Sequence, residues 1–185
     1  DEIAAAFGEV IDSKSPYTSG HSARVALYAD CIAAELGLTP HRRRWLKRAS
    51  LLHDMGKLGV SNAILDKPGK LNEDEWAAVR QHAVYTETIL SRIGAFTEMA
   101  IVSGAHHERL DGKGYPRGIS GEAISLETRI ITTADIFDAI TAERPYRGAM
   151  PVAKTLAIMG SEVGQAIDPR CFEALQRIVD ELGLS

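Results

Sequence analysis

The chain has 185 residues, of which 45% are hydrophobic and 25% are charged, and this length predicts a single domain over residues 1–185. Its formal net charge of -4 argues against long DNA or RNA as a partner, because phosphate neutralisation needs a basic surface, but a small nucleotide held by a few cations is allowed. No apolar run approaches the roughly 18 residues of a membrane span, so no membrane segment is predicted.

The N-terminal residues show an apolar pattern from the first turn onward, at Ile3, Phe7 and Val10. This spacing is typical of a helix. Because the pattern is already running where the chain begins, we expect residues 1–14 to continue a helix from an upstream regulatory region. The first residues lack the basic start, followed by an apolar run, that is typical of a signal peptide.

Apolar residues at helical spacing recur along the rest of the chain. They predict helices over residues 25–36, 40–56, 72–90, 97–107, 126–142 and 168–182. Helix starts are marked by Thr39 and Asp168, each followed by proline, and by Asn72 with Glu75, which form a capping box. Since no alternating strand pattern or internal repeat is found, the predicted fold is all-α, with function at helix ends and in the glycine-rich loop 111–121.

Two cysteines, Cys31 and Cys171, lie far apart and form no CxxC motif. Such cysteines are typical of small core side chains in a reducing cytoplasm.

Histidine placement is the most informative local feature. The six histidines are His21, His41, His53, His82, His106 and His107. His41 fits an exposed first helical turn, but His53 precedes Asp54, and His106 and His107 are adjacent. Imidazole with carboxylate suits Fe, Mn, Zn or Ni, although a lone helical histidine is more often structural. By spacing alone, a metal cluster and ordinary structural histidines explain the pattern equally well.

Longer motifs separate these alternatives. The chain reads HDMGK at 53–57, HHERLDGKGYP at 106–116 and DIFDA followed by RPYR within 135–147. These segments resemble the HDxGK, HHExxDGxGYP and DxFDAxTxxRPYR elements of the HD-GYP branch of the HD superfamily of metal phosphohydrolases. Shorter matches at 17–21, 64–69 and 164–169 extend the resemblance from Tyr17 to Pro169.

The resemblance implies a compact helical HD-domain bundle with a metal centre in its core and a glycine-rich GYP loop. One divalent ion would be held by His21, His53, Asp54 and Asp135, and Asp54 would bridge to a second ion held by His82, His106 and His107. Tyr17 stands where some members carry a glutamate for a third metal, so two ions are expected. Mixed nitrogen and oxygen donors favour Fe or Mn, with Zn or Ni as alternatives.

The resemblance also implies the substrate contacts. Lys57 would meet the scissile phosphate, Arg144 and Arg147 would contact phosphate or guanine, and Tyr115 would shape the pocket. In two-metal sites a hydroxide that bridges the ions attacks phosphorus. The leaving oxygen needs a proton, which Lys57, Asp111 or a metal-bound water could provide. The expected catalytic residues are therefore Lys57, Asp54 and Asp111.

The implied function is hydrolysis of cyclic di-GMP to pGpG, with GMP as a further product, in the bacterial cytoplasm. A first alternative is hydrolysis of another nucleotide, such as a hybrid cyclic dinucleotide or a dNTP, although the GYP block disfavours a dNTP. A second is a catalytically silent metal- or nucleotide-binding signalling module, which the complete ligand set disfavours. The GYP loop, residues 111–116, is expected to form a pocket wall or to dock a diguanylate cyclase or other signalling protein.

Overall fold

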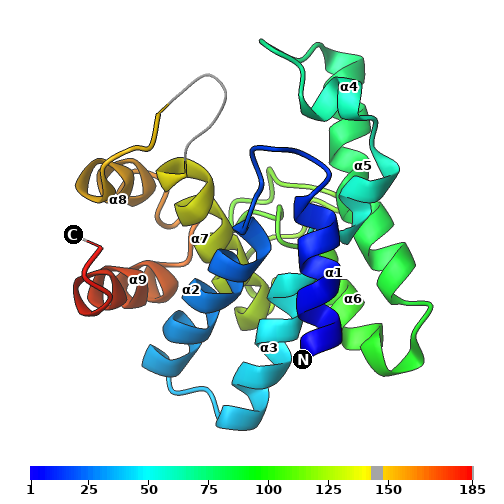
Figure 1. The fold of residues 1–185 in the computed structure, drawn as a ribbon. Helices are drawn as coiled ribbons and strands as arrows, with labels where there is room; N and C mark the ends of the chain where they lie inside the picture. The colour runs from blue at the N-terminus through cyan, green and yellow to red at the C-terminus, as the bar shows by residue number, and fades with distance from the viewer. Residues whose placement is uncertain (143–147, 185) are drawn as a thin grey trace.

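The computed structural model describes residues 1–142 and 148–184, whose arrangement is drawn in Figure 1. The predicted all-α class is confirmed, because β geometry in these ranges is limited to an isolated bridge between Val163 and Ile167. The α-helices are α1 (Glu2–Asp12), α2 (His21–Glu35), α3 (Pro40–Leu51), α4 (Asn62–Leu65), α5 (Glu73–Leu90), α6 (Thr97–Gly104), α7 (Leu126–Thr141), α8 (Val152–Gly160) and α9 (Pro169–Glu181). Short 3₁₀ turns are η1 (Met55–Gly59), η2 (Gly94–Phe96) and η3 (Gly121–Ala123). Across the same ranges, none of the helices combines the length and the apolar character needed to cross a membrane.

Helix α2 packs against α1, α3, α7 and α9, while α5 and α6 pack on each other beside η1 (Figure 1). The core between them is aliphatic and aromatic. Ile32, Leu46, Ile130, Phe137 and Leu175 are each at most 1% exposed. Burying a side chain of this size stabilises the fold by roughly 1.5–3 kcal/mol, so this core holds α2, α3, α7 and α9 in fixed positions around the residues discussed below.

Side-chain caps begin the helices where the sequence predicts them. The Thr39 hydroxyl accepts a hydrogen bond from the first turn of α3. Asn72 and Glu75 form the reciprocal capping box of α5, and Asp168 accepts two backbone N–H bonds at the start of α9. Each such cap contributes about 1 kcal/mol to helix stability.

Helix α3 ends at Leu51, earlier than the predicted end near Gly56, because the following turn is held against α5. The Gly56 amide donates to the Thr86 hydroxyl at 2.8 Å, and that hydroxyl donates to the His53 carbonyl at 3.1 Å. A Cβ atom at Gly56 would overlap the backbone of His82. Glycine is therefore required for η1 to approach α5 this closely.

Helix α6 ends at Gly104, so the predicted helix over 97–107 is too long by one turn. His106 and His107 lie in the turn that follows, and the interpretation of them as neighbours on one helix is wrong. A Cβ atom at Gly104 would lie 3.1 Å from the Ala83 carbonyl and 3.0 Å from Glu87 Cβ. This close packing on α5 carries the chain away from the helical path and toward the interior.

The sequence analysis did not predict α4 or α8. Helix α8 does carry apolar residues at helical spacing, at Val152, Leu156 and Met159, so a signal for it was present. In α9, Leu175, Ile178 and Val179 are buried, whereas Leu182, the residue after the helix, is 39% exposed.

Helix α1 ends at Asp12, and its apolar pattern does not face the core. Ile3, Phe7 and Val10 are exposed, whereas Ala4 and Ile11 are buried. Small residues on the inner face allow α1 to lie close to α2 and α3. Its continuation into an upstream region remains a prediction.

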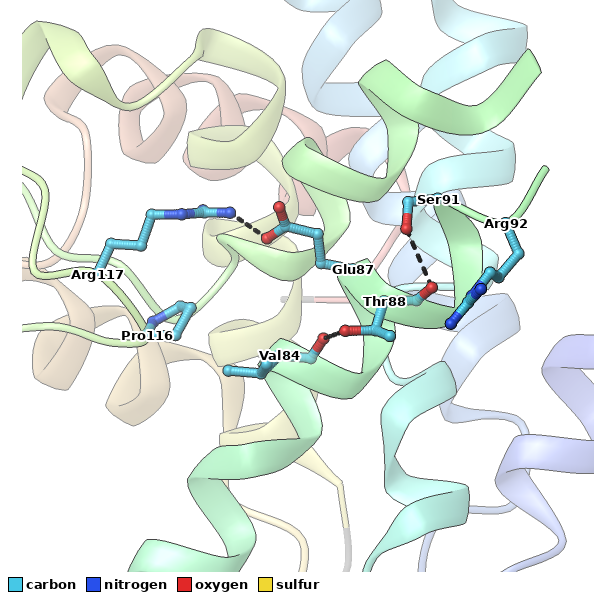
Figure 2. A pocket seen from close by; sticks show the side chains of 7 residues that line it. All are labelled: Val84, Glu87, Thr88, Ser91, Arg92, Pro116 and Arg117. Atoms are coloured by element: carbon cyan, nitrogen blue, oxygen red, sulfur yellow. Dashed lines mark hydrogen bonds and ion pairs between the residues drawn. The ribbon is translucent and has the colours of Figure 1, made fainter. Parts of the chain in front are cut away.

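An open hollow of about 630 Å³ lies between α5 and the loop that follows Tyr115 (Figure 2). Its lining residues are Val84, Glu87, Thr88, Ser91, Arg92, Pro116 and Arg117. Arg117 forms an ion pair with Glu87 across this hollow, which ties the loop to α5.

Candidate metal centre

The seven histidine and aspartate residues predicted as metal ligands meet in the interior, and we call them the His/Asp centre. They come from the start of α2, from α5 and α7, and from the turns after α3 and α6. Donor atoms lie within 4.8 Å of one another in three sets: His82, His106 and His107; His21, His53 and Asp54; and His53, His106 and Asp135. All seven predicted ligands are thus brought together, whereas His41 is exposed on α3.

Three of the histidines share one hydrogen-bonding arrangement. Nδ1 of His53, His82 and His106 lies 2.6, 2.5 and 2.6 Å from the carbonyl oxygen three residues earlier in the chain. Only a protonated Nδ1 can donate to a carbonyl, so the lone pair of each ring is on Nε2. A backbone partner of this kind orients a metal-ligating histidine.

Asp54 lies between two groups of imidazoles. Its Oδ1 is 3.5 Å from His82 Nε2 and 3.7 Å from His106 Nε2. Its Oδ2 is 3.5 Å from Nε2 of both His21 and His53. Because the two carboxylate oxygens face different groups, this residue is suited to bridge two cations.

Buried atoms without a hydrogen-bond partner show that the donor set fits a metal. Among the described residues, these are His53 Nε2, Asp54 Oδ1 and His106 Nε2. A buried polar atom left unpaired costs about 1–3 kcal/mol, so such atoms are rare unless a ligand satisfies them. These three converge within the His/Asp centre, where a divalent cation would accept their lone pairs.

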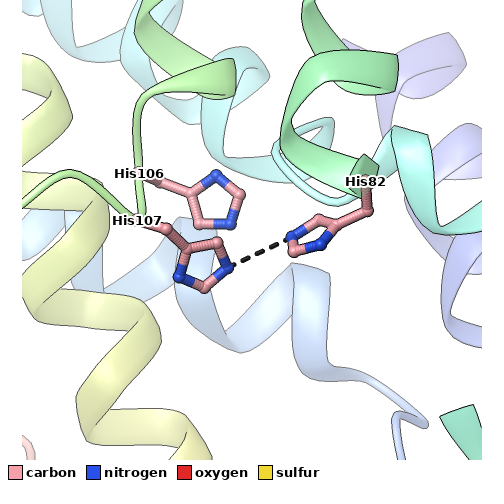
Figure 3. Close-up of side chains that lie close together, drawn as sticks. All are labelled: His82, His106 and His107. Atoms are coloured by element: carbon pink, nitrogen blue, oxygen red, sulfur yellow. Dashed lines mark hydrogen bonds between the residues drawn. The ribbon is translucent and has the colours of Figure 1, made fainter. Parts of the chain in front are cut away.

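A second distance agrees with this conclusion. Nε2 of His107 and Nε2 of His82 are 3.1 Å apart, and His106 lies beside them (Figure 3). With metal–nitrogen bonds of about 2.0–2.1 Å, two ligands on one ion are separated by roughly 3.0–3.4 Å. The His82, His106 and His107 rings are therefore spaced as ligands of a single ion.

Burial determines the charge state on this side of the centre. It lowers the pKa of His82, and burial together with the neighbouring His107 places the pKa of His106 well below its usual range. Burial likewise lowers the pKa of His107 to about 3. These imidazoles are neutral at physiological pH, which is the form that binds metals.

The other side of the centre attracts positive charge. Burial lowers the pKa of His21, but hydrogen bonds to Asp135, Asp138 and Asp54 outweigh it and raise the pKa well above its usual value. His53 behaves similarly: burial is outweighed by Asp54 and Asp135, and its pKa is raised. The carboxylates that stabilise protonated His21 and His53 would stabilise a bound metal cation in the same way.

Asp138 orients the first ligand of α2. It accepts from His21 Nδ1 at 2.7 Å and from Arg24 at 2.6 and 3.1 Å. Asp138 thus forms a salt bridge with Arg24 and orients the His21 ring. Arg24 was not singled out, although its position one turn after His21 was a signal for it.

Lys57 and Tyr115 lie at the edge of the centre. Lys57 Nζ is 2.5 Å from Asp54 Oδ2, and its side chain is 26% exposed. The Tyr115 ring stacks on His107 with a centroid separation of 4.8 Å and an interplanar angle of 21°. Both side chains are therefore available to a molecule that enters the centre from solvent.

Asp111 has other partners. Its carboxylate accepts from Arg109 and from the Lys113 amide, and these bonds lower its pKa to about 2. Such a group stays ionised at neutral pH and is a poor proton donor. Arg144 and Arg147, the predicted phosphate or guanine contacts, lie outside the described residues.

Glu108 shapes the GYP loop from inside. This residue is 2% exposed, and its carboxylate accepts from the amides of Arg117 at 2.7 Å and Ile119 at 3.1 Å. A Cβ atom at Gly114 would overlap the backbone of His107 and Glu108. Gly114 and Glu108 therefore stabilise the fold of the loop that follows the candidate ligands His106 and His107.

A helical bundle around buried, paired His/Asp donors is the architecture of metal-dependent HD proteins. Residues 6–171 match the family model described as HD domain. The chain belongs to the HD domain family, and the resemblance to its HD-GYP branch is confirmed by the relatives.

The 3′3′-cGAMP-specific phosphodiesterase 3 of Vibrio cholerae is 62% identical over 97% of this chain and 39% of the relative. The cyclic di-GMP phosphodiesterase response regulator RpfG of Xanthomonas campestris is 38% identical over 95% of this chain and 47% of the relative. The chain thus spans less than half the length of these curated relatives.

Two solved structures share the fold. The cyclic GMP-AMP specific phosphodiesterase V-cGAP3 of V. cholerae has a TM-score of 0.61 and 57% identity, over 96% of this chain and 40% of that one. Bd1817, an HDGYP protein from Bdellovibrio bacteriovorus, has a TM-score of 0.73 over 97% of this chain and 63% of that one. At 19% identity, Bd1817 supports the fold alone.

Proposed function

We propose that this chain is the catalytic domain of a metal-dependent phosphodiesterase that hydrolyses a cyclic dinucleotide, with 3′3′-cGAMP as the preferred substrate. The observation that carries the proposal is the position of Asp54, whose two oxygens face separate groups of histidines. That arrangement is suited to two cations, and paired cations are a common solution for phosphodiester hydrolysis.

The proposed ligand sets are those that the family resemblance implies, and the distances around Asp54 support them. His21, His53, Asp54 and Asp135 would hold one ion, and Asp54, His82, His106 and His107 would hold the other. Bound divalent ions supply Lewis acidity toward phosphate and lower the pKa of coordinated water. Fe or Mn is proposed because nitrogen and oxygen donors are mixed in both sets.

The protein side chains would position and neutralise the phosphate. Lys57, whose Nζ is 2.5 Å from Asp54 Oδ2, would donate a hydrogen bond to a phosphate oxygen next to the bridging carboxylate. Tyr115, stacked on His107, would form one wall of the pocket. For the proton that the leaving oxygen needs, Lys57 is preferred over Asp111, because the low pKa of Asp111 keeps it ionised. Arg144 and Arg147 remain predicted contacts.

The choice between substrates rests on the relatives. The expectation from sequence was cyclic di-GMP, and a relative with 38% identity bears that name. A relative with 62% identity is named as specific for 3′3′-cGAMP. We therefore place 3′3′-cGAMP first and cyclic di-GMP second. Docking of a signalling protein on residues 111–116 and a cytoplasmic location remain predictions.

Product analysis tests the proposal. The protein would be loaded anaerobically with Mn(II) or Fe(II), given 3′3′-cGAMP and cyclic di-GMP at equal concentration, and the nucleotides separated by chromatography. We expect linear dinucleotide from both, faster from 3′3′-cGAMP, and none after chelator treatment. If the metal-loaded protein forms no product from 3′3′-cGAMP and none from cyclic di-GMP, the proposed function is refuted. Faster turnover of cyclic di-GMP would reverse the substrate order only.

A further inference from the structure

Arg80 is a cation at the edge of the His/Asp centre that the proposed chemistry does not use. It lies on α5, two residues before His82, and is exposed. Its guanidinium carbon is 5.6 Å from the centroid of the Tyr115 ring. Across residues 1–142 and 148–184, no ion pair or hydrogen bond of the Arg80 side chain is present, whereas Arg24, Arg109 and Arg117 pair with carboxylates.

Tyr115 connects Arg80 to the centre. One side of its ring stacks on His107, and His82 lies edge-on at 6.4 Å. The Tyr115 ring thus contacts both His107 of the centre and the guanidinium of Arg80.

A cyclic dinucleotide carries two phosphodiesters, and each has a negative charge. While one of them occupies the centre, Lys57 and the bound ions can neutralise it. The other phosphodiester is joined to the scissile one through two ribose units, so it would lie outside the centre. An arginine that is not already paired is the side chain best suited to meet it, because its planar fork donates two parallel bonds to phosphate oxygens.

We propose that Arg80, held over Tyr115, binds the second, non-scissile phosphate of the cyclic dinucleotide. This inference rests on the proposed function. It assigns Arg80 to substrate binding rather than to the chemical step. Loss of the Arg80 guanidinium should therefore change KM far more than kcat. It also predicts that substrates with a single phosphate do not use Arg80.

The test compares Arg80→Ala, Arg80→Lys and Arg92→Ala in the Mn(II)-loaded protein. Arg92 is the matched control, since it is an exposed arginine two residues after the end of α5 and it lines the hollow shown in Figure 2. Each variant would be assayed on 3′3′-cGAMP, which has two phosphates, and on bis(p-nitrophenyl) phosphate, which has one. Metal content per chain would be measured in parallel.

For Arg80→Ala we expect KM for 3′3′-cGAMP to rise about tenfold, in line with loss of one charge-assisted contact, with kcat and metal content unchanged. Arg80→Lys keeps the charge but loses the planar fork, so it should recover only part of that loss. Hydrolysis of bis(p-nitrophenyl) phosphate should be the same in all variants, and Arg92→Ala should match the wild type on both substrates.

Three results would overturn the inference: an unchanged KM for 3′3′-cGAMP in Arg80→Ala, an equal loss on bis(p-nitrophenyl) phosphate, or a lysine variant as impaired as the alanine variant. The last would mean that the planar fork contacts a base. If the wild-type protein cleaves bis(p-nitrophenyl) phosphate but no cyclic dinucleotide, the proposed function itself fails and the inference with it. If the wild type hydrolyses 3′3′-cGAMP and Arg80→Ala has the same kinetics, the inference about Arg80 is refuted while the proposed function stands.

Discussion

Asp138 and His21 are 117 positions apart in the sequence, and their side chains meet at 2.7 Å in the interior. The carboxylate of Asp138 on α7 accepts a hydrogen bond from Nδ1 of His21 at the start of α2, and Nε2 of that histidine is thereby directed to Asp54 and Asp135. This bond links two helices of the core to the geometry of the His/Asp centre.

From this relationship we predict that Asp138→Asn weakens metal binding by about 10- to 100-fold, the usual effect of losing a partner that orients a ligand. Chelator competition monitored by metal content would measure the change. The matched control is Asp30→Asn, since Asp30 also lies next to an arginine, Arg43, but away from the centre. Equal metal affinity in Asp138→Asn and wild type would contradict the orienting function.

A second prediction concerns the bridging carboxylate. Asp54→Ala should abolish turnover and strongly reduce loading of both metal positions, because each position loses an oxygen donor. Metal per chain and product formation would be measured on the same preparation, with His41→Ala as the control outside the centre. Unchanged turnover in Asp54→Ala would rule out the two-metal proposal.

The ligands were predictable because the motifs that contain them are local in sequence, as HDMGK and HHERLDGKGYP show. The caps at Thr39, Asn72 and Asp168 were predictable for the same reason, since a cap involves residues three apart. The ends of α3 and α6 were not. They are set by Thr86 and Gly104, whose contacts join residues that are between 17 (Gly104 and Glu87) and 33 (Thr86 and His53) positions apart.

The face of α1 shows a different limit. Periodicity predicted a helix there, and the helix is present, but Ile3 and Phe7 point outward while Ala4 is buried. Hydrophobicity alone cannot place the inner face when close packing favours small residues. Arg24 and Asp138 also show that a partner which acts through another side chain is visible mainly in three dimensions.

A third prediction follows from Thr86, which joins η1 to α5. Thr86→Val keeps the shape of the side chain but removes the acceptor for the Gly56 amide and the donor to the His53 carbonyl. Two buried backbone groups would be left unpaired, so we expect a loss of about 1–3 kcal/mol in the free energy of unfolding. Thr86→Ser keeps the hydroxyl and should lose less. Denaturant unfolding would measure both, and a Thr86→Val variant as stable as the wild type would show that these hydrogen bonds do not contribute to stability.

The fourth prediction concerns pH and a pair remote from the centre. Asp168 is 3% exposed and lies 2.8 Å from Arg129. Burial raises the pKa of this carboxyl, but the Arg129 bond and the amides of Cys171 and Arg170 outweigh burial and lower it. A carboxyl whose pKa is lower in the folded state stabilises the fold above its ordinary pKa of about 3.9, and this contribution is lost as the pH falls through the folded value.

Asp168→Asn preserves a side-chain oxygen that can cap α9 but removes the charge opposite Arg129. We expect the variant to be less stable than the wild type by about 1–3 kcal/mol at pH 7, since a charge-assisted bond is weakened while Arg129 keeps its bonds to backbone carbonyls. The difference should begin to shrink as the pH falls below about 4 and should be lost at the lower pH at which the folded wild-type carboxyl is protonated. Denaturant unfolding of both proteins at matched pH values would measure it, and comparison at each pH cancels contributions from the His/Asp centre. A difference that stays constant down to pH 3 would mean that geometry, rather than charge, accounts for the effect of Asp168.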